Sequence, residues 1–218
     1  MFNLSRSNKV FTFCIFTYGI FLSFNGYSQI FEGSITYKTE VAILERLSDD
    51  VEINIRKDLE KDGASTSVNY YKKGNYASIT AHKDVTEFHV FNPIDGLIYA
   101  WTEGNNTALT HDFENHLESE EKVQEIDTTQ IILGIECKGL VISAGSLTTA
   151  YWYNTDYFRM DTTMYQQNQY AKQIGCFPFK VETATESVLT VNEIVNYREI
   201  PLSKDLFKIP AFDVITPY

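Results

Sequence analysis

The sequence predicts a β-rich α+β protein, a curved antiparallel sheet or open half-barrel with one or two covering helices. Three observations lead to this fold class. Apolar and polar residues alternate over long stretches, which is the period of a half-buried strand. Glycine- and proline-containing turns separate these stretches. Two segments break the alternation, and they supply little helix to cover such a sheet.

The longest predicted strand covers residues 31–43, with Ile35, Tyr37 and Val41 on its apolar face. A second long alternation runs through Ile131, Leu133, Ile135, Cys137 and Val141. Residues 70–76 and 91–97 are predicted hairpins, because each contains a glycine that can adopt a positive φ. Shorter strands are expected at 148–154, 177–183 and 187–197.

The first break in the alternation is at residues 44–59. Apolar residues recur there at spacings of three and four, which predicts an amphipathic helix, although residues 51–55 fit a strand equally well. Residues 160–172 are polar and have room for a turn or two of helix before Gly175. These two segments are the expected helical cover of the sheet.

Residues 1–28 have the features of a cleaved signal peptide. Arg6 and Lys9 precede a mostly apolar run at 10–24, which is short for a membrane span, and small residues at Gly26 and Ser28 suit cleavage before Gln29. An uncleaved membrane anchor is the alternative. We expect a mature chain of residues 29–218, a single exported β-rich domain in the periplasm or outside the cell.

The composition excludes some partners. The formal net charge is −11, and removing the signal peptide would make the chain more acidic still. Adjacent basic residues occur only as isolated pairs such as Lys72 and Lys73, so no basic stripe is present to bind nucleic acid or anionic lipid headgroups. Cys137 and Cys176 remain after cleavage, and strand parity argues against a disulfide between them.

No catalytic or metal motif stands out in the sequence. His111 and His116 lie five residues apart, which separates their side chains on a helix or strand, and His82 and His89 are expected at the surface or at a strand edge. Cys137 has the apolar parity of its strand, which favours a buried, inert thiol. We therefore expect no metal, no cofactor and no enzymatic activity.

Aromatic residues carry the functional signal. Many lie at alternate positions of predicted strands, where they either pack the core or line a small-molecule cavity. The residues assigned to a hypothetical ligand cavity are Tyr37, Val41, Tyr99, Trp101, Leu133, Ile135, Tyr151 and Phe179.

Four short motifs are spread along the chain: QIFEGSITY at 29–37, ILGIECK at 132–138, AYWYNT at 150–155 and LFKIP at 206–210. Together they resemble the GLPGLI family of exported Bacteroidetes proteins. The segment that names the family departs from its pattern here, because GCFPFKVE at 175–182 lacks the second glycine. The family is similar in pattern to outer-membrane lipoprotein carriers, which implies an open half-barrel closed by helices over an apolar cavity. The resemblance implies no catalytic residue.

The leading functional hypothesis is an extracytoplasmic binding protein that holds a lipid, an acyl chain or another hydrophobic ligand. The alternative is an envelope interaction module whose concave face is filled by its own side chains. A hydrolase with an unrecognised site comes third. A hydrophobic adduct that co-purifies with the protein and is detected by native mass spectrometry would separate the first hypothesis from the second.

Overall fold

The computed structural model describes residues 30–44, 65–112, 122–161 and 169–217. The predicted signal peptide, most of the helix predicted at 44–59 and His116 lie outside these ranges. In the described part of the chain, no helix is long and apolar enough to cross a membrane.

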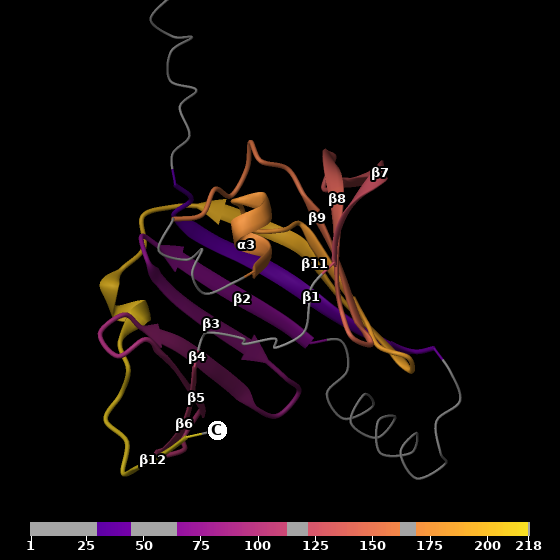
Figure 1. Ribbon diagram of the computed structural model, residues 1–218. Coiled ribbons are helices and arrows are strands. Elements are labelled where there is room, and N and C mark those ends of the chain that lie inside the picture. Colours follow the sequence, from indigo (N-terminus) through magenta and orange to yellow (C-terminus); the bar gives the residue numbers. More distant parts are fainter. Residues whose placement is uncertain (1–29, 45–64, 113–121, 162–168, 218) are drawn as a thin grey trace, which may run out of the picture.

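Twelve strands form one open, curved sheet (Figure 1). The spatial order is β12-β6-β5-β4-β3-β2-β1-β11-β10-β9-β8-β7, and every pair is antiparallel except the parallel pair β12 and β6. The strands are β1 (Gly33–Ile43), β2 (Ser65–Lys72), β3 (Asn75–Ala81), β4 (Thr86–Asn92), β5 (Leu97–Thr102), β6 (Thr107–Asp112), β7 (Lys122–Ile132), β8 (Ile135–Ala144), β9 (Leu147–Tyr153), β10 (Lys180–Ala184), β11 (Val188–Glu199) and β12 (Val214–Pro217).

Helix is scarce in the described ranges. They contain one α-helix, α3 (Gln169–Ile174), and one 3-10 turn, η2 (Lys204–Phe207). Gly175 ends α3 with a φ of 68°. The open curved sheet is therefore as predicted, whereas the helical cover is reduced there to this short α3.

Both predicted hairpins are confirmed. The β2–β3 turn contains Gly74 and the β4–β5 turn contains Gly96, with φ values of 76° and 75°. In the second turn, the Asn92 and Asp95 side chains accept hydrogen bonds from the backbone N–H groups of Ile94 and Leu97. Turn chemistry of this kind fixes the register of the flanking strands.

The single strand predicted through Leu133 is wrong. The chain turns back at Leu133 and Gly134, whose φ values are 51° and 78°, so β7 ends before them and β8 begins after them. Two successive positive φ angles match a type I′ turn, whose twist suits a hairpin. Leu133 is 49% exposed at this turn, on neither face of a strand.

We expect Leu133→Asn to stabilise the protein by about 0.5–1 kcal/mol, because asparagine tolerates the left-handed conformation that leucine resists. The measurement is urea unfolding of the parent and the variant. Leu133→Ala is the control, since it removes the same exposed side chain without favouring a positive φ. Equal stability of the two variants would contradict this interpretation of the turn.

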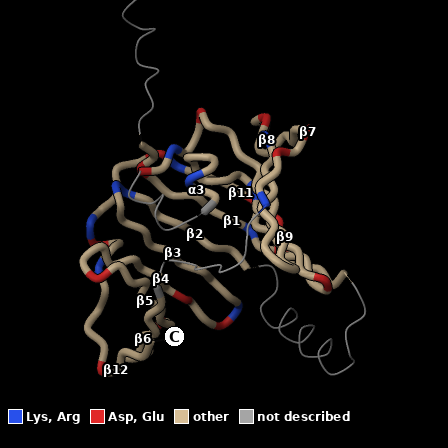
Figure 2. The backbone as a smooth tube through the Cα atoms, in the orientation of Figure 1, with Lys and Arg blue, Asp and Glu red and all other residues tan. Residues whose placement is uncertain are grey.

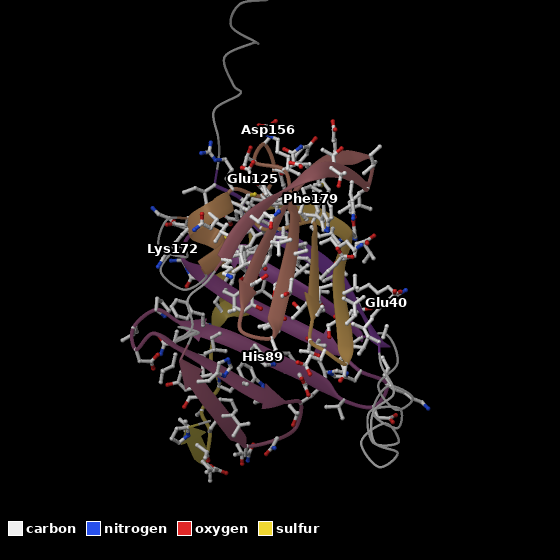
Figure 3. All side chains as sticks on the ribbon, turned by 45° about the vertical axis from the view of Figure 1, so that its right-hand side comes forward. Glu40, His89, Glu125, Asp156, Lys172 and Phe179 are labelled. Carbon is white, nitrogen blue, oxygen red and sulfur yellow. The ribbon has the colours of Figure 1, made fainter. Side chains whose placement is uncertain are left out.

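The main core lies at the end of the sheet where β1 begins and β11 ends. Ile35, Ile194 and Phe179 are almost fully buried there. The ring of Phe158 packs against the rings of Phe31 and Phe179, with centroids 5.1 and 4.8 Å away. Figure 3 shows Phe179 within a crowd of side chains, whereas Lys172 of α3 lies at the margin.

The C-terminal segment is held by a small ionic group. The Glu32 carboxylate accepts a hydrogen bond from the backbone N–H of Leu202 at 2.9 Å and pairs with the Lys72 ammonium at 3.0 Å. Phe212 then packs against Trp101, with ring centroids 5.4 Å apart. This segment, yellow in Figure 1, runs from β11 to β12 at the far edge of the sheet.

A half-buried hydrogen bond to a carboxylate, which also forms an ion pair within β10, joins β9 and β10. The Trp152 indole N–H donates to the Glu182 carboxylate at 2.7 Å, and the Lys180 ammonium lies 2.8 Å from the same carboxylate. Burial alone would raise the pKa of Glu182, but the hydrogen bonds from Lys180 and Trp152 outweigh it and hold the pKa below its ordinary value of 4.5.

The stabilisation from Glu182 should therefore disappear in acid. A carboxyl group with a lowered folded-state pKa stabilises the fold above its unfolded pKa, and loses that effect as the pH falls through the folded value. The stability advantage of the parent over Glu182→Gln, measured by urea unfolding, should be full at pH 7 and shrink below about pH 4.5. An advantage that grows in acid would contradict the assignment.

Candidate functional site

A cavity of about 280 Å³ opens on the concave face of the sheet, beneath α3. Its walls come from widely separated parts of the chain, and the strands among them lie in one continuous part of the sheet in Figure 1. The lining residues are Tyr37, Ser67, Asn69, Tyr71, Tyr76, Ile98, Tyr170, Phe177, Pro178, Val181 and Asn192.

Strand alternation and register bring these side chains together. Ser67, Asn69 and Tyr71 occupy every second position of β2 and so share one face. Tyr37 of β1 lies directly opposite Ser67, and Tyr76 of β3 lies opposite Tyr71. These cross-strand pairs form the floor of the cavity.

The roof comes from α3 and the segment that follows it. Tyr170 on α3 contributes one wall, and Phe177 and Pro178 contribute another. The Phe177 ring lies against the Tyr71 ring, with centroids 3.7 Å apart, and this contact joins the roof to β2. The Tyr37 hydroxyl donates a 2.9 Å hydrogen bond to the carbonyl oxygen of Pro178, which makes a second connection.

The polar groups of the cavity are mostly paired. The Thr39 hydroxyl donates to the Asn192 amide oxygen at 2.6 Å. Burial raises the pKa of Tyr71, and a hydrogen bond with the Asn69 side chain opposes part of that rise. The exception is Oδ1 of Asn69, a buried acceptor with no hydrogen-bond partner among the described residues. Because its neighbours cover this atom, it contributes a partial negative charge near the cavity and no exposed acceptor.

The cavity is electrically neutral. Burial raises the pKa values of Tyr37, Tyr71, Tyr76 and Tyr170, so all four hydroxyls stay protonated at neutral pH. No lysine, arginine, histidine or carboxylate belongs to the lining that the described residues form. Figure 2 shows the charged residues of β2–β6 mainly at turns and strand ends.

The structure brings together only part of the set assigned to the cavity from the sequence. Tyr37 lines it. Tyr151 lies next to it, stacked on Tyr170 with ring centroids 4.7 Å apart. Phe179 is fully buried in the main core, and Ile135 packs against that core. Val41 is half-buried further along β1 and lies outside the lining.

The other three assigned residues lie elsewhere. Tyr99 and Trp101 alternate with the cavity residue Ile98 on β5, so their side chains are on the opposite face of the sheet. There the Tyr99 hydroxyl donates to Asp95 at 2.8 Å, and Trp101 stacks on Phe88. Leu133 occupies the β7–β8 turn. The alternation in the sequence did not show which alternate residues of β5 face the cavity.

The polar residues of the cavity lining, such as Ser67 and Asn69 on β2, were not predicted from the sequence. The alternation of Ser67, Asn69 and Tyr71 was a usable signal, because two polar residues share a strand face with an aromatic one. Tyr170 carried no such signal, since it lies on α3, outside the strands, and alternation does not show where α3 lies on the sheet.

Three histidines lie near one another on the strands beyond the cavity. The Nε2 atoms of His82 and His89 lie 3.6 and 3.9 Å from the Glu87 carboxylate, and the His89 and His111 rings are 6.3 Å apart. Burial is the main cause that lowers the pKa of His89. Within the ranges that the structure describes, no group of three such side chains is arranged to hold a metal ion.

Cys137 and Cys176, the cysteines within the described ranges, are free and buried. Burial raises the pKa of Cys137 to about 11 and that of Cys176 to about 12. Both thiols therefore stay protonated at neutral pH, where they are weak nucleophiles.

Comparison with known proteins identifies a shared fold but does not assign the chain to a family. No family model and no curated protein sequence matches the chain, so the GLPGLI resemblance stays a prediction. An uncharacterised conserved protein from Thermus thermophilus is similar over 86% of this chain and 91% of its own, with a TM-score of 0.50 and 9% identity. That likeness shows a shared fold.

Two further solved structures resemble the chain more loosely. The LolA superfamily protein NE2245 from Nitrosomonas europaea matches over 84% of this chain and 92% of its own, with a TM-score of 0.41 and 8% identity. PNGF-II matches over 86% of this chain with a TM-score of 0.48 and 13% identity. The chain spans about a third of the length of PNGF-II, 32%.

Proposed function

We propose that this protein binds a small hydrophobic molecule in the cavity on the concave face of its sheet. The observation that carries the proposal is the character of the cavity, which is lined by aromatic rings and contains no charged side chain among the described residues. Ligand sites in proteins are typically concave and apolar, with a few polar groups that orient the ligand.

The size of the cavity limits the ligand. Its volume of about 280 Å³ is near the lower end of small-molecule sites. A compact molecule or part of a single alkyl chain matches this space better than a whole lipid with several chains. The proposal also places the protein outside the cytoplasm, on the strength of the signal-like residues 1–28. It assigns the protein no chemical reaction.

The experiment that tests this function is a titration with N-phenylnaphthylamine, a neutral fluorescent probe of apolar sites. Ser67 and Thr66 are neighbours on β2, but Ser67 lines the cavity and Thr66 is exposed on the other face. Ser67→Phe places a ring inside the cavity and should weaken binding at least about tenfold, or about 1.4 kcal/mol.

Thr66→Phe adds the same ring to the same strand on the opposite face, and should leave the affinity unchanged. Urea unfolding of both variants checks that each is folded. If the parent does not bind the probe, or if both variants bind it as the parent does, the proposed function is wrong.

A further inference from the structure

The cavity presents an unusual concentration of aromatic rings. Tyr37, Tyr71, Tyr76 and Tyr170 line it together with Phe177. The rings come from β1, β2, β3, α3 and the segment after α3, so they approach the enclosed space from several directions. The face of an aromatic ring carries a partial negative charge. Rings grouped around one space therefore attract a cation placed between them.

The polar atoms of the cavity point to the same preference. The Asn69 amide oxygen is buried and accepts no hydrogen bond from the described residues. The Pro178 carbonyl, also part of the lining, adds a second oxygen that receives the Tyr37 hydroxyl. The Asn69 oxygen is covered by its neighbours, so it acts on a ligand through its partial negative charge, which attracts a cation and repels an anion.

The described lining offers no positively charged side chain to pair with an anionic head group of a ligand. The described lining contains neither lysine nor arginine, so a carboxylate or phosphate would lose its water without gaining a positive charge. The whole chain carries a formal net charge of −11, which favours the approach of cations and disfavours that of anions.

If the ligand carries an ammonium group, the hydrogen-bond acceptors of the cavity limit how many N–H donors that group can bring. A primary ammonium has three N–H donors and is strongly hydrated, so burying it requires several acceptors. Among the described lining residues, Asn69 Oδ1 is the buried acceptor left unfilled, and five of the eleven lining residues are aromatic. A tertiary ammonium has a single donor and a quaternary ammonium has none, and their alkyl groups can contact the rings.

We propose that the ligand of this cavity carries an alkylated ammonium group on a compact apolar body. The proposal rests on the proposed function, since it names the chemical class of the ligand that the same cavity holds. It makes the aromatic rings of the lining the main source of selectivity for a cation over a neutral or anionic head group.

The test is competition by three compounds with eight-carbon chains that differ in their head groups. Octyltrimethylammonium, octanol and octanoate are each titrated against N-phenylnaphthylamine bound to the full-length mature protein, and calorimetry confirms their affinities. We expect the cation to bind at least about tenfold more tightly than the alcohol, because several rings each contribute to a cation–π interaction. Octanoate should bind most weakly.

A variant makes the test specific to the rings. Tyr170→Leu keeps an apolar side chain at this wall but removes the ring, so the ratio of cation to alcohol affinity should fall at least about threefold. If Tyr170 had only a structural role, its replacement would lower the affinities for the cation and the alcohol equally and leave their ratio unchanged.

The outcomes separate the two proposals. Equal affinity for cation and alcohol, tighter binding of octanoate, or an unchanged ratio in Tyr170→Leu would overturn the ammonium inference and leave the proposed function in place. If the parent protein does not bind the fluorescent probe, the proposed function is wrong and the inference falls with it.

Discussion

Gly33→Ala should destabilise the protein by about 3 kcal/mol or more, because the new methyl group has no room. A Cβ atom at this position would lie 2.0 Å from the backbone carbonyl oxygen of Arg198. Gly33 pairs with Glu199 of β11 and with Tyr71 of β2, so the backbone of one strand must shift to relieve the clash. Overpacking that moves backbone is at the costly end of single substitutions.

Urea unfolding measures this effect, and Gly104→Ala is the matched control. A Cβ atom at Gly104 meets nothing within 4 Å, so that change carries only the cost of its positive φ of 78°, about 1 kcal/mol. If Gly33→Ala were no more harmful than Gly104→Ala, the close approach of β1 and β11 would be wrong.

Phe179→Ala should lower the free energy of unfolding by about 3–5 kcal/mol. The Phe179 side chain is fully buried, and its ring packs against Phe158 and Tyr157 with centroids 4.8 and 5.8 Å away. Its removal leaves a void among rings that are themselves held by other contacts, so little collapse is expected.

The same substitution decides between two roles of Phe179. If its ring lined an open cavity, it would lack neighbours on one side and its loss would cost much less than that of a core phenylalanine. Chemical denaturation measures the difference, with Ile94→Ala, which truncates a side chain that is 94% exposed, as the reference for a change of less than about 0.5 kcal/mol. A loss close to that of Ile94→Ala would contradict the core position of Phe179.

Much of the sheet could be predicted because its signals are local. The β2–β3 and β4–β5 hairpins depend on glycines at fixed turn positions, and the alternation of β1 follows from its single half-buried face. The failure at Leu133 has a physical cause as well. A two-residue turn preserves the alternation on either side, so a hairpin with an apolar turn residue has the pattern of one long strand.

The candidate site was less predictable, because it depends on contacts between distant segments. Parity placed Tyr37 on an apolar face, but it could not show that Ile98 rather than Tyr99 faces inward on β5. The C-terminal segment favours that choice, since Phe212 packs on Trp101 of the same strand. Tyr170 reaches the cavity because α3 lies above the sheet.

The central claim is that the cavity beneath α3 holds a small molecule, and native mass spectrometry of the protein tests it most directly. Protein purified without detergent should carry one small-molecule adduct per chain. Thr66→Phe should retain the adduct, and Ser67→Phe, which places a ring in the cavity, should lose it. A parent protein observed only at its bare mass, or an adduct that persists in Ser67→Phe, would contradict the account.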